Sequence, residues 1–314
     1  MASVQTGPSL FWRLIDGVEG LLRRLVPPKR RGLTGWIFLS PALLLVGILA
    51  VGLGYIIEYS FHELDIATYR LKDAYSLGNY QTLIERPVYR NVLWRSLLGA
   101  ALVTAITLFF AFPYAYAMTR TRSSSMRKFL LIALFLPFFI GQVVRAYGWL
   151  IILGKQGVIN AALAGLGLGT LDLIYNYGAV IFGLIQYMLP FAVLLLLPAL
   201  AAIPEDVEMA SEGLGATWVS TFRHVVLPMA KPGLIGSGIV VFTLTLTDFA
   251  MPEILGGGTT DFVASAIYDS FFQISNAGLG AALSVALVLI GSAFVALFFS
   301  VAGSTTLDIG GETK

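Results

Sequence analysis

Six apolar segments, each long enough to cross a lipid bilayer, limit what this chain can fold into. A helix needs about 20 apolar residues to cross the hydrocarbon core, and the six segments cover residues 35–61, 94–118, 129–153, 178–203, 233–252 and 279–303. Hydrophobic residues make up 57% of the chain and charged residues only 12%, which a water-soluble domain cannot bury. Because backbone in lipid must satisfy its own hydrogen bonds, the sequence predicts an all-α integral membrane protein with six transmembrane helices.

Several functional classes are excluded by what the sequence lacks. There is no cysteine, so the chain has no disulfide, no thiol nucleophile and no cysteine-ligated metal. His62 and His224 fall in different predicted loops without spaced ligands beside them, so we expect no metal site. A phosphate-binding loop of the Gly-x-x-x-x-Gly-Lys-Ser/Thr type is also missing. The formal charge of +2 is too small to indicate a nucleic-acid partner. We therefore expect a non-catalytic chain that binds no cofactor of its own.

The distribution of Lys and Arg predicts the orientation in the membrane. Basic residues concentrate in residues 1–34 and in the loop at 119–128, whereas the loops at 62–93, 154–177 and 253–278 carry fewer. Cytoplasmic loops are enriched in Lys and Arg. We therefore expect both termini and the loop at 204–232 to be cytoplasmic, and the other three loops to face outward.

The N-terminal residues 1–34 are predicted to form a cytoplasmic arm. Within it, residues 9–26 place leucines and other apolar residues at helical spacing, with charges mostly off that stripe, and Pro27 and Pro28 follow. This pattern is typical of an amphipathic helix that lies at the membrane interface. The sequence thus divides into this arm, a six-helix domain at 35–303 and a cytoplasmic tail at 304–314.

The loop at 204–232 has the features of a stiff polar hairpin. Pro204 and the acidic pair Glu205 and Asp206 favour a helix start. Gly215 permits a sharp turn, and Pro228 prevents a second short helix from continuing straight into the fifth apolar segment. We expect two short helices joined at Gly215, which together form a knob.

The same loop resembles the cytoplasmic loop that permease subunits of bacterial ABC importers press into their ATPase partners. That family's pattern is Glu-Ala-Ala, three residues, Gly, nine residues and Ile-x-Leu-Pro, and here Met209-Ala210-Ser211, Gly215 and Val225-Val226-Leu227-Pro228 keep the spacing. Met209 replaces the Glu of the pattern, and Glu208 lies beside it. The resemblance implies contact with an ATPase through nine residues, which are Glu208, Met209, Ala210, Ser211, Leu214, Gly215, Arg223, Leu227 and Pro228.

The resemblance implies a type I ABC importer permease fold and a set of partners. These are a dimer of ATPase subunits that binds ATP and Mg²⁺, a second homologous permease subunit, an extracytoplasmic binding protein and the lipid of a bacterial inner membrane. A self-contained transporter driven by an ion gradient is the competing class, with Asp248 and Glu58 as its only acids inside the apolar segments. A receptor or structural membrane protein would not explain the loop.

Two further stretches are similar to the spermidine/putrescine branch of these importers. They are PFFIGQVVRAYGWLIILGKQGVIN at 137–160 and LTDFAMPEILGGG at 246–258. With the loop at 204–232, the resemblance covers residues 94–303. It implies a polyamine as the transported solute, and the branch also contains carriers of γ-aminobutyrate and aminoethylphosphonate, which leaves a zwitterion as the alternative.

Polar residues deep in the apolar segments are candidates for the transport path, because charges there are costly unless they pair or face water. An ammonium would be drawn to Asp248, and a carboxylate or phosphonate to Arg145, but similar predicted depths also permit an ion pair between the two. Aromatic side chains could hold an amine by cation–π contact, although anchoring of helices is an alternative role for them. The predicted path residues are Arg145, Tyr147, Trp149, Gln186, Tyr187, Asp248 and Glu253.

Overall fold

The structure of the chain is a computed structural model that describes residues 31–302. It divides into two compact units, Met1–Ile56 and Ile57–Lys314. The predicted amphipathic helix at 9–26 and the predicted tail at 304–314 lie outside the described residues. The described part of the first unit lies in α2 (Arg31–Ser60), whose last residues belong to the second unit. The apolar part of this helix, Phe38–Ser60, is long enough to cross a membrane. The helix begins at Arg31, so the last residues of the predicted arm belong to it.

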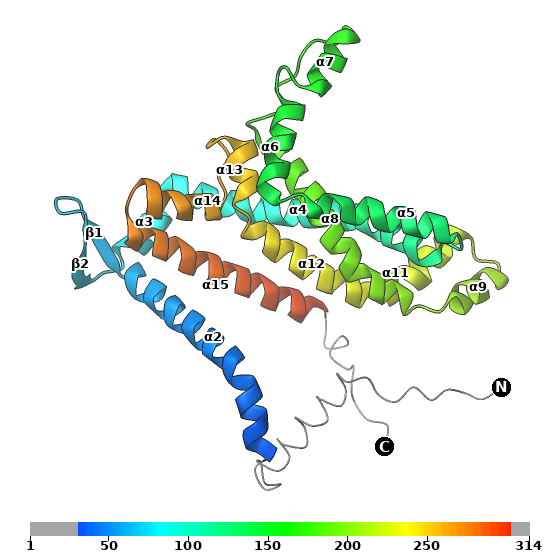
Figure 1. Cartoon of the computed structure of the whole chain (residues 1–314), viewed down its shortest axis with the longest axis horizontal. Coiled ribbons are helices and arrows are strands. Elements are labelled where there is room, and N and C mark those ends of the chain that lie inside the picture. The colour runs from blue at the N-terminus through cyan, green and yellow to red at the C-terminus, as the bar shows by residue number, and fades with distance from the viewer. Residues whose placement is uncertain (1–30, 303–314) are drawn as a thin grey trace, which may run out of the picture. The chain divides into compact units, whose positions relative to one another are not determined.

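The second unit is built mainly from helices, and Figure 1 shows their order along the chain. Its elements after the end of α2 are β1 (His62–Asp65), β2 (Arg70–Tyr75), α3 (Gly78–Glu85), α4 (Pro87–Arg120), α5 (Ser124–Phe135), η2 (Leu136–Phe139), α6 (Gln142–Leu153), α7 (Val158–Gly165), α8 (Tyr177–Ala201), α9 (Glu205–Gly213), α10 (Trp218–Thr221), η3 (Phe222–Val226), α11 (Leu227–Met229), α12 (Lys231–Leu246), α13 (Ala250–Gly256), α14 (Val263–Tyr268), η4 (Asp269–Gln273) and α15 (Ala277–Ala302).

The core of this unit lies where α4, α8 and α12 pack against one another, as Figure 1 shows. Val103, Leu184 and Val241 are fully buried, one from each helix. Small residues allow the close approach of α12 to α8, since a Cβ atom added to Gly233 would lie only 2.3 Å from the Cβ atom of Ala199. In lipid, where apolar side chains gain little by leaving the solvent, such close packing is a main source of helix association.

A buried serine fastens the first half of α4 to α14. The hydroxyl of Ser96 donates to the carbonyl of Val92 in its own helix and accepts from the backbone N–H of Val263, both at 2.8 Å. Val263 is the first residue of α14, so this bond satisfies one of the amides that a helix start leaves without a partner. The other end of α4 reaches the loop at 204–232, so the two ends of this helix meet different parts of the chain.

Four of the six predicted spans are confirmed as continuous helices, and two are not. Four helices are long and apolar enough to cross a membrane, and two bent helix pairs would bring the number to six. The third predicted span, 129–153, is broken between α5 and α6, where the chain bends by 97°. The fifth, 233–252, is also discontinuous, since α12 ends at Leu246 and α13 begins at Ala250. Proline and glycine account for the first break, because Pro137 cannot continue a helical hydrogen-bond ladder and Gly141 precedes α6.

A short antiparallel hairpin interrupts the otherwise helical fold. Strands β1 and β2 pair with His62 opposite Tyr75 and Asp65 opposite Arg70, and a register shift falls between His62 and Leu64. The side chain of Asp65 accepts from the backbone N–H of Ala67 and from the hydroxyl of Thr68, which ties the turn together. The loop at 154–177 likewise contains its own helix, α7.

Candidate functional site

The loop at 204–232, called the coupling loop below, begins with a helix that ends in a defined glycine cap. Pro204 precedes α9, and Glu205, Asp206 and Glu208 lie in its first turn, near the positive end of the helix dipole. Gly215 has φ of +89°. Its N–H donates to the carbonyl of Glu212 and the N–H of Ala216 donates to that of Ser211, which is the hydrogen-bond pattern of a Schellman cap. The turn at Gly215 therefore confirms the expectation of two short helices joined there.

The second arm of the coupling loop runs through α10, a π-helical turn (η3) and α11. Thr217 caps its start by accepting from the N–H of Ser220. The hydroxyls of Ser211 and Thr221 lie 3.0 Å apart and connect the two arms. The ring of Phe222 packs edge-on against Phe112 of α4, with ring centroids 5.3 Å apart. The loop is thus a folded hairpin that rests on α4.

Glu208, predicted to be a polar contact for the ATPase, is turned into the protein. One of its carboxylate oxygens accepts from the hydroxyl of Tyr116 at 2.6 Å, and the other accepts from Nε of Arg120 at 2.9 Å. Tyr116 and Arg120 belong to the last turns of α4. The neighbouring Met209, which occupies the Glu position of the pattern, is instead 55% exposed. Glu208 therefore binds α4, and the apolar side chain of Met209 faces outward.

The other predicted coupling residues lie mostly at the surface. Leu214, at the tip beside Gly215, is 91% exposed. Ser211 is half-buried between the two arms. The exposed positions are Ala210, Gly215, Arg223, Leu227 and Pro228. The tip of the loop thus presents an apolar knob that is open to a partner.

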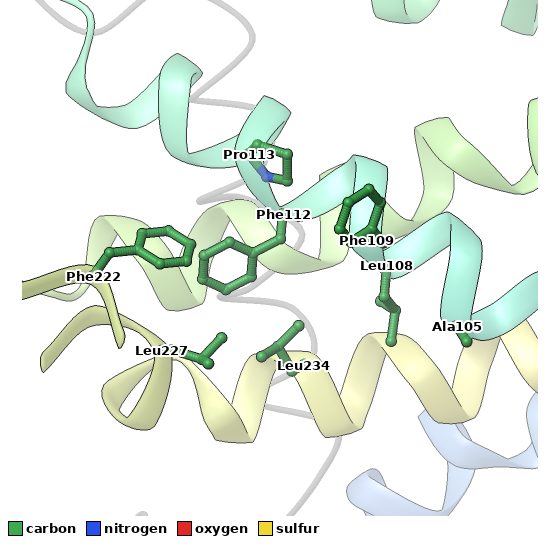
Figure 2. Close-up of a pocket in the computed structure, with 8 residues that line it drawn as sticks. All are labelled: Ala105, Leu108, Phe109, Phe112, Pro113, Phe222, Leu227 and Leu234. Atoms are coloured by element: carbon green, nitrogen blue, oxygen red, sulfur yellow. The ribbon is translucent and has the colours of Figure 1, made fainter. Parts of the chain in front are cut away.

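An apolar pocket of about 410 Å³ lies beneath the second arm of the coupling loop. Figure 2 shows the rings of Phe112 and Phe222 side by side in its lining, with Leu227 and Leu234 below them. Its remaining lining comes from α4, namely Ala105, Leu108, Phe109 and Pro113. The second arm therefore packs on α4 through a partly filled contact.

The predicted path residue Arg145 lies at the break between α5 and α6 and caps it. Its guanidinium donates to the backbone carbonyls of Pro137 and Ile140, and the carbonyl of Pro137 also accepts from the N–H of Ile140. Arg145 is buried, and its guanidinium carbon lies 5.3 Å from the centroid of the Tyr187 ring on α8. The charge is thus placed over an aromatic face, where a cation is attracted.

Asp248 lies in the second break, between α12 and α13. Asp248 is buried, with 7% of its surface exposed. One carboxylate oxygen accepts from the amide nitrogen of Gln142, at the start of α6, and the other accepts from the N–H of Met251 at 3.0 Å. Arg145 and Asp248 thus take different partners, and no ion pair joins them in the part of the chain that the structure describes.

The structure distributes the predicted path residues over two pockets. The pocket at Asp248, of about 340 Å³, is lined by Gln142, Tyr187, Met188, Phe191, Leu244, Thr247, Asp248, Phe249 and Ala250. The pocket at Arg145, of about 400 Å³, is lined by Pro137, Ile140, Val144, Arg145, Gly148, Trp149, Ile152 and Gln186. In the second pocket, Nε1 of Trp149 donates to the side-chain oxygen of Gln186 at 3.4 Å. Tyr147 lines neither pocket and is exposed.

Glu253 lies in α13 and belongs to a group of three carboxylates. Burial raises its pKa, and repulsion by Asp269 and Asp261 adds to the effect. The pKa of Asp261 is raised in the same way by burial and by Asp269, although Arg95 opposes the shift. This group is separate from the residues that line the two pockets. Among residues 31–302, no set of three His, Cys, Asp or Glu side chains is arranged to hold a metal ion.

Several residues at these sites were not among the predicted ones. Gln142 and Phe249 line the pocket at Asp248, and Tyr116 and Arg120 hold Glu208. Gln142 could have been found, since it is a polar side chain three residues before Arg145 in an apolar segment. Tyr116 and Arg120 carried no such signal, because they lie 92 and 88 residues from Glu208 in sequence.

Comparison with known families and proteins gives matches over most of the chain. Residues 106–303 match the family described as "Binding-protein-dependent transport system inner membrane component". The chain is 31% identical over 300 residues to the inner membrane ABC transporter permease protein YdcU of Escherichia coli, covering 87% of this chain and 95% of that protein. It is 29% identical over 226 residues to the spermidine/putrescine transport system permease protein PotB of Haemophilus influenzae, covering 71% and 78%.

Solved structures with a similar fold include a bacterial alginate ABC transporter in complex with an alginate pentasaccharide-bound periplasmic protein. The superposition has a TM-score of 0.65 at 18% sequence identity and covers 86% of this chain and 98% of that chain. At this level of identity the likeness concerns the fold.

Proposed function

Because the chain belongs to the family of binding-protein-dependent transport system inner membrane components, we propose that it carries a small amine-bearing solute, first of all a polyamine, across the inner membrane. The chain is a permease component of an ABC importer with the type I fold, and it is not an enzyme. The naming of relatives as spermidine/putrescine permeases supports the polyamine. An ion-driven carrier is disfavoured by this family membership.

The observation that carries the proposal is the buried carboxylate of Asp248 in a pocket with aromatic walls. Its partners, Gln142 and the N–H of Met251, are neutral donors, so the negative charge has no cation of its own among the described residues. Tyr187, Phe191 and Phe249 add ring faces to the same pocket. A carboxylate beside aromatic rings is the surrounding that an ammonium group prefers.

The engagement of Arg145 favours an amine over a zwitterion. A guanidinium that is to bind a carboxylate or phosphonate needs two free, parallel donors. Here Nη2 of Arg145 already donates to two backbone carbonyls, and those bonds hold the break between α5 and α6. The guanidinium is thus committed mainly to the fold.

One observation keeps a second candidate open, a zwitterion such as γ-aminobutyrate or aminoethylphosphonate. Nε of Arg145 is buried and has no hydrogen-bond partner, and Arg145 lines a pocket of its own. A solute with an amine at Asp248 and an anionic group at Arg145 would use both pockets. Buried donors without partners are costly, which is the physical reason to test this candidate beside the first.

The proposed mechanism is alternating access driven from outside the chain. Two ATPase subunits bind ATP and Mg²⁺ on the cytoplasmic side and press on the coupling loop, and an extracytoplasmic binding protein delivers the solute. Residues 204–232 would then face the cytoplasm together with both termini. The pocket at Asp248 would open alternately to each side as the halves of the broken spans move. A second, homologous permease subunit completes the membrane core.

Uptake by the reconstituted importer tests the proposed solute. The chain, its second membrane subunit, the ATPase and the binding protein are placed in proteoliposomes with internal ATP, and uptake of radiolabelled spermidine, γ-aminobutyrate and aminoethylphosphonate is compared. We expect ATP-dependent uptake of spermidine. Uptake of a zwitterion alone would favour the second candidate, and uptake without ATP would contradict the importer mechanism.

Mass spectrometry of the intact complex tests the composition of the membrane core. Two different permease masses in equal amounts are expected. A single permease mass present twice would show a homodimer instead.

A further inference from the structure

The two halves of the coupling loop are attached to the membrane helices in different ways. The first arm, α9, is joined to α4 by an ion pair and hydrogen bonds between buried side chains. The second arm, from α10 to α11, lies against α4 through ring contacts over an apolar pocket. Because of this difference, a displacement of the loop is transmitted more directly to α4 than to α12, which follows the second arm.

The attachment of α9 has little freedom. The side chains of Arg120 and Glu208 are only 15% and 12% exposed. Arg120 donates to Oε1 of Glu208 through both Nε, at 2.9 Å, and Nη2, at 2.5 Å. Tyr116 holds Oε2 at 2.6 Å. A guanidinium fork fixes direction as well as distance, so α9 cannot rotate or slide on α4 without breaking several bonds at once.

Arg120 also connects these two helices to a third. Its Nη2 donates to the backbone carbonyl of Ile203, just past the end of α8, at 2.9 Å. The carbonyls at a helix end otherwise lack partners. One side chain thus joins the ends of α4 and α8 to the helix of the coupling loop.

The attachment of the second arm is compliant by comparison. Its backbone passes through the π-helical turn η3 and then Pro228, and the chain bends by 66° between Trp218–Met229 and Lys231–Leu246. Figure 2 shows Phe222 and Leu227 of this arm over the apolar pocket. Ring and methyl contacts of this kind have no fixed direction, so they permit sliding that an ion pair resists.

We propose that Glu208, Arg120 and Tyr116 form a clamp that makes α9, α4 and the end of α8 move as one body, while α12 shifts relative to that body through the compliant second arm. The inference rests on the proposed function, because it takes an ATPase to move α9. Glu208 is in this view a positioning residue, which acts through α4 and not on the partner. Helix geometry also accounts for Met209 at the position where the family pattern has Glu. Successive helix residues point about 100° apart, so Met209 faces outward, toward the proposed partner, when Glu208 is turned inward.

Distances between paired spin labels test the clamp without any solute. The chain has no cysteine of its own, so Glu212→Cys on α9 can be paired with Ala117→Cys on α4 or with Lys231→Cys at the start of α12. All three positions are exposed. The full complex is measured without nucleotide and with ATP and vanadate. We expect the distance from α9 to α4 to stay the same and the distance from α9 to α12 to change.

The outcomes separate the clamp from the function on which it rests. A distance from α9 to α4 that changes as much as that from α9 to α12 would overturn the clamp. If neither distance changes with ATP although the complex still imports solute, α12 moves with the clamped helices and the proposed contrast between the two arms is overturned. If the complex hydrolyses ATP without importing any solute, the proposed function itself fails.

The variant Glu208→Gln supplies a second readout, with Glu212→Gln as its matched control on the exposed side of the same helix. In the control, we expect the wild-type number of ATP molecules hydrolysed per solute imported. In Glu208→Gln we expect that number to rise at least about tenfold, and the label distance from α9 to α4 to broaden. Tyr116→Phe, which removes one hydroxyl, should give a smaller rise. A wild-type ratio and a narrow distance distribution in Glu208→Gln would refute the clamp. Loss of ATPase binding in Glu208→Gln, with a narrow distribution, would instead show that Glu208 contacts the partner.

Discussion

Arg145 and Tyr187 form a cation–π contact, with 5.3 Å between the guanidinium carbon and the ring centroid. Arg145 lines one of the two pockets and Tyr187 lines the other. The contact also joins the break between α5 and α6 to the middle of α8, which is one of the core helices. A solute that disturbs the ring of Tyr187 from the pocket at Asp248 would therefore act on the residue that holds the broken span.

Asp248→Asn is predicted to impair uptake of a cation without unfolding the protein. The Asn oxygen can still accept from the N–H of Met251, and its NH2 group can donate to the side-chain oxygen of Gln142 once that amide flips. The local contacts are thus replaced, but the negative charge is lost. A hydrogen bond to a charged group contributes about 1.5–3 kcal/mol, which corresponds to roughly a ten- to hundredfold rise in KM for spermidine. Uptake kinetics in proteoliposomes measure it. Asp172→Asn, at an exposed ion pair with Lys155, should leave KM unchanged, and an unaltered KM in Asp248→Asn would remove the cation site.

Arg145→Met is predicted to lower the stability of the membrane domain. The methionine fills part of the space but donates no hydrogen bond, so the carbonyls of Pro137 and Ile140 are left without it. The carbonyl of Pro137 keeps the N–H of Ile140, but each lost hydrogen bond to a charged group costs about 1.5–3 kcal/mol. The thermal unfolding midpoint in detergent should fall, together with uptake of every solute. A normal midpoint combined with selective loss of zwitterion uptake would instead identify Arg145 as a solute contact.

Gly215→Val is predicted to disrupt the coupling loop through its backbone alone. A Cβ atom at this position would meet no other atom within 4 Å, so steric contact is not the cause. The positive φ is the cause, because a left-handed conformation costs most residues about 1–2 kcal/mol. Transport should be lost while the protein still inserts in the membrane. Gly215→Asn, which tolerates this conformation, should keep much of the uptake; equal loss in both variants would contradict the explanation.

Leu214→Asp is predicted to weaken binding of the ATPase without changing the stability of the chain. Leu214 is 91% exposed, so its substitution breaks no packing within the chain. A carboxylate at the tip would have to lose its water when the knob enters a partner. Binding of the purified ATPase to nanodiscs that hold the membrane subunits measures the effect, and Leu214→Met serves as the control. Unchanged binding in Leu214→Asp would exclude the tip from the interface.

Protonation of Glu253 is predicted to stabilise the fold at mildly acidic pH. Its pKa in the folded protein is raised above the ordinary value of 4.5 by burial and by the repulsion of Asp269 and Asp261. The folded state therefore binds more protons than the unfolded state just above that value, and stability falls as pH rises through this window. Asp261 and Asp269 face Glu253 with the same sign, and Arg95 opposes them only at Asp261.

Thermal unfolding from pH 4.5 to pH 8 checks this prediction. The variant Glu253→Gln should be more stable than the wild type at neutral pH and should show a weaker loss of stability as pH rises. An identical pH profile in both proteins would contradict it.

The sequence predicted the helices that are set by apolar length but not the breaks within them. The bounds of α8 and α15 lie within two residues of the predicted ones, whereas α4 begins at Pro87, seven residues before the predicted span. The break at Pro137 and Gly141 had a local signal, since both residues disfavour a continuous helix. The apolar run across this region nevertheless led to the prediction of one continuous span. The bend of 97° means that depths counted along a straight helix do not apply to residues after it.

The same limit applies to the two sites. The turn at Gly215 could be predicted, because a glycine cap is a local feature of the chain. The contact of Glu208 with Arg120 could not, because helix propensity does not say which side of α9 meets α4. Depths counted along straight helices placed Arg145 and Asp248 at similar levels and so permitted an ion pair. In the bent structure each of them has other partners. Features set by neighbouring residues could be predicted from the sequence, whereas contacts between helices could not.

The bend between α5 and α6 also has a consequence for how the protein enters the membrane. Each of the two helices has 12 residues and is about 18 Å long, whereas the hydrocarbon core is about 30 Å thick. Neither can leave the insertion machinery for lipid as a complete span. The polar backbone at the break needs the guanidinium of Arg145, and α6 packs against α13 and α8, which follow it in the chain. Residues 124–165 should thus stay beside the translocon until α8 and α13 have been synthesised. Insertion of this segment then depends on contacts with later helices and not only on its own hydrophobicity.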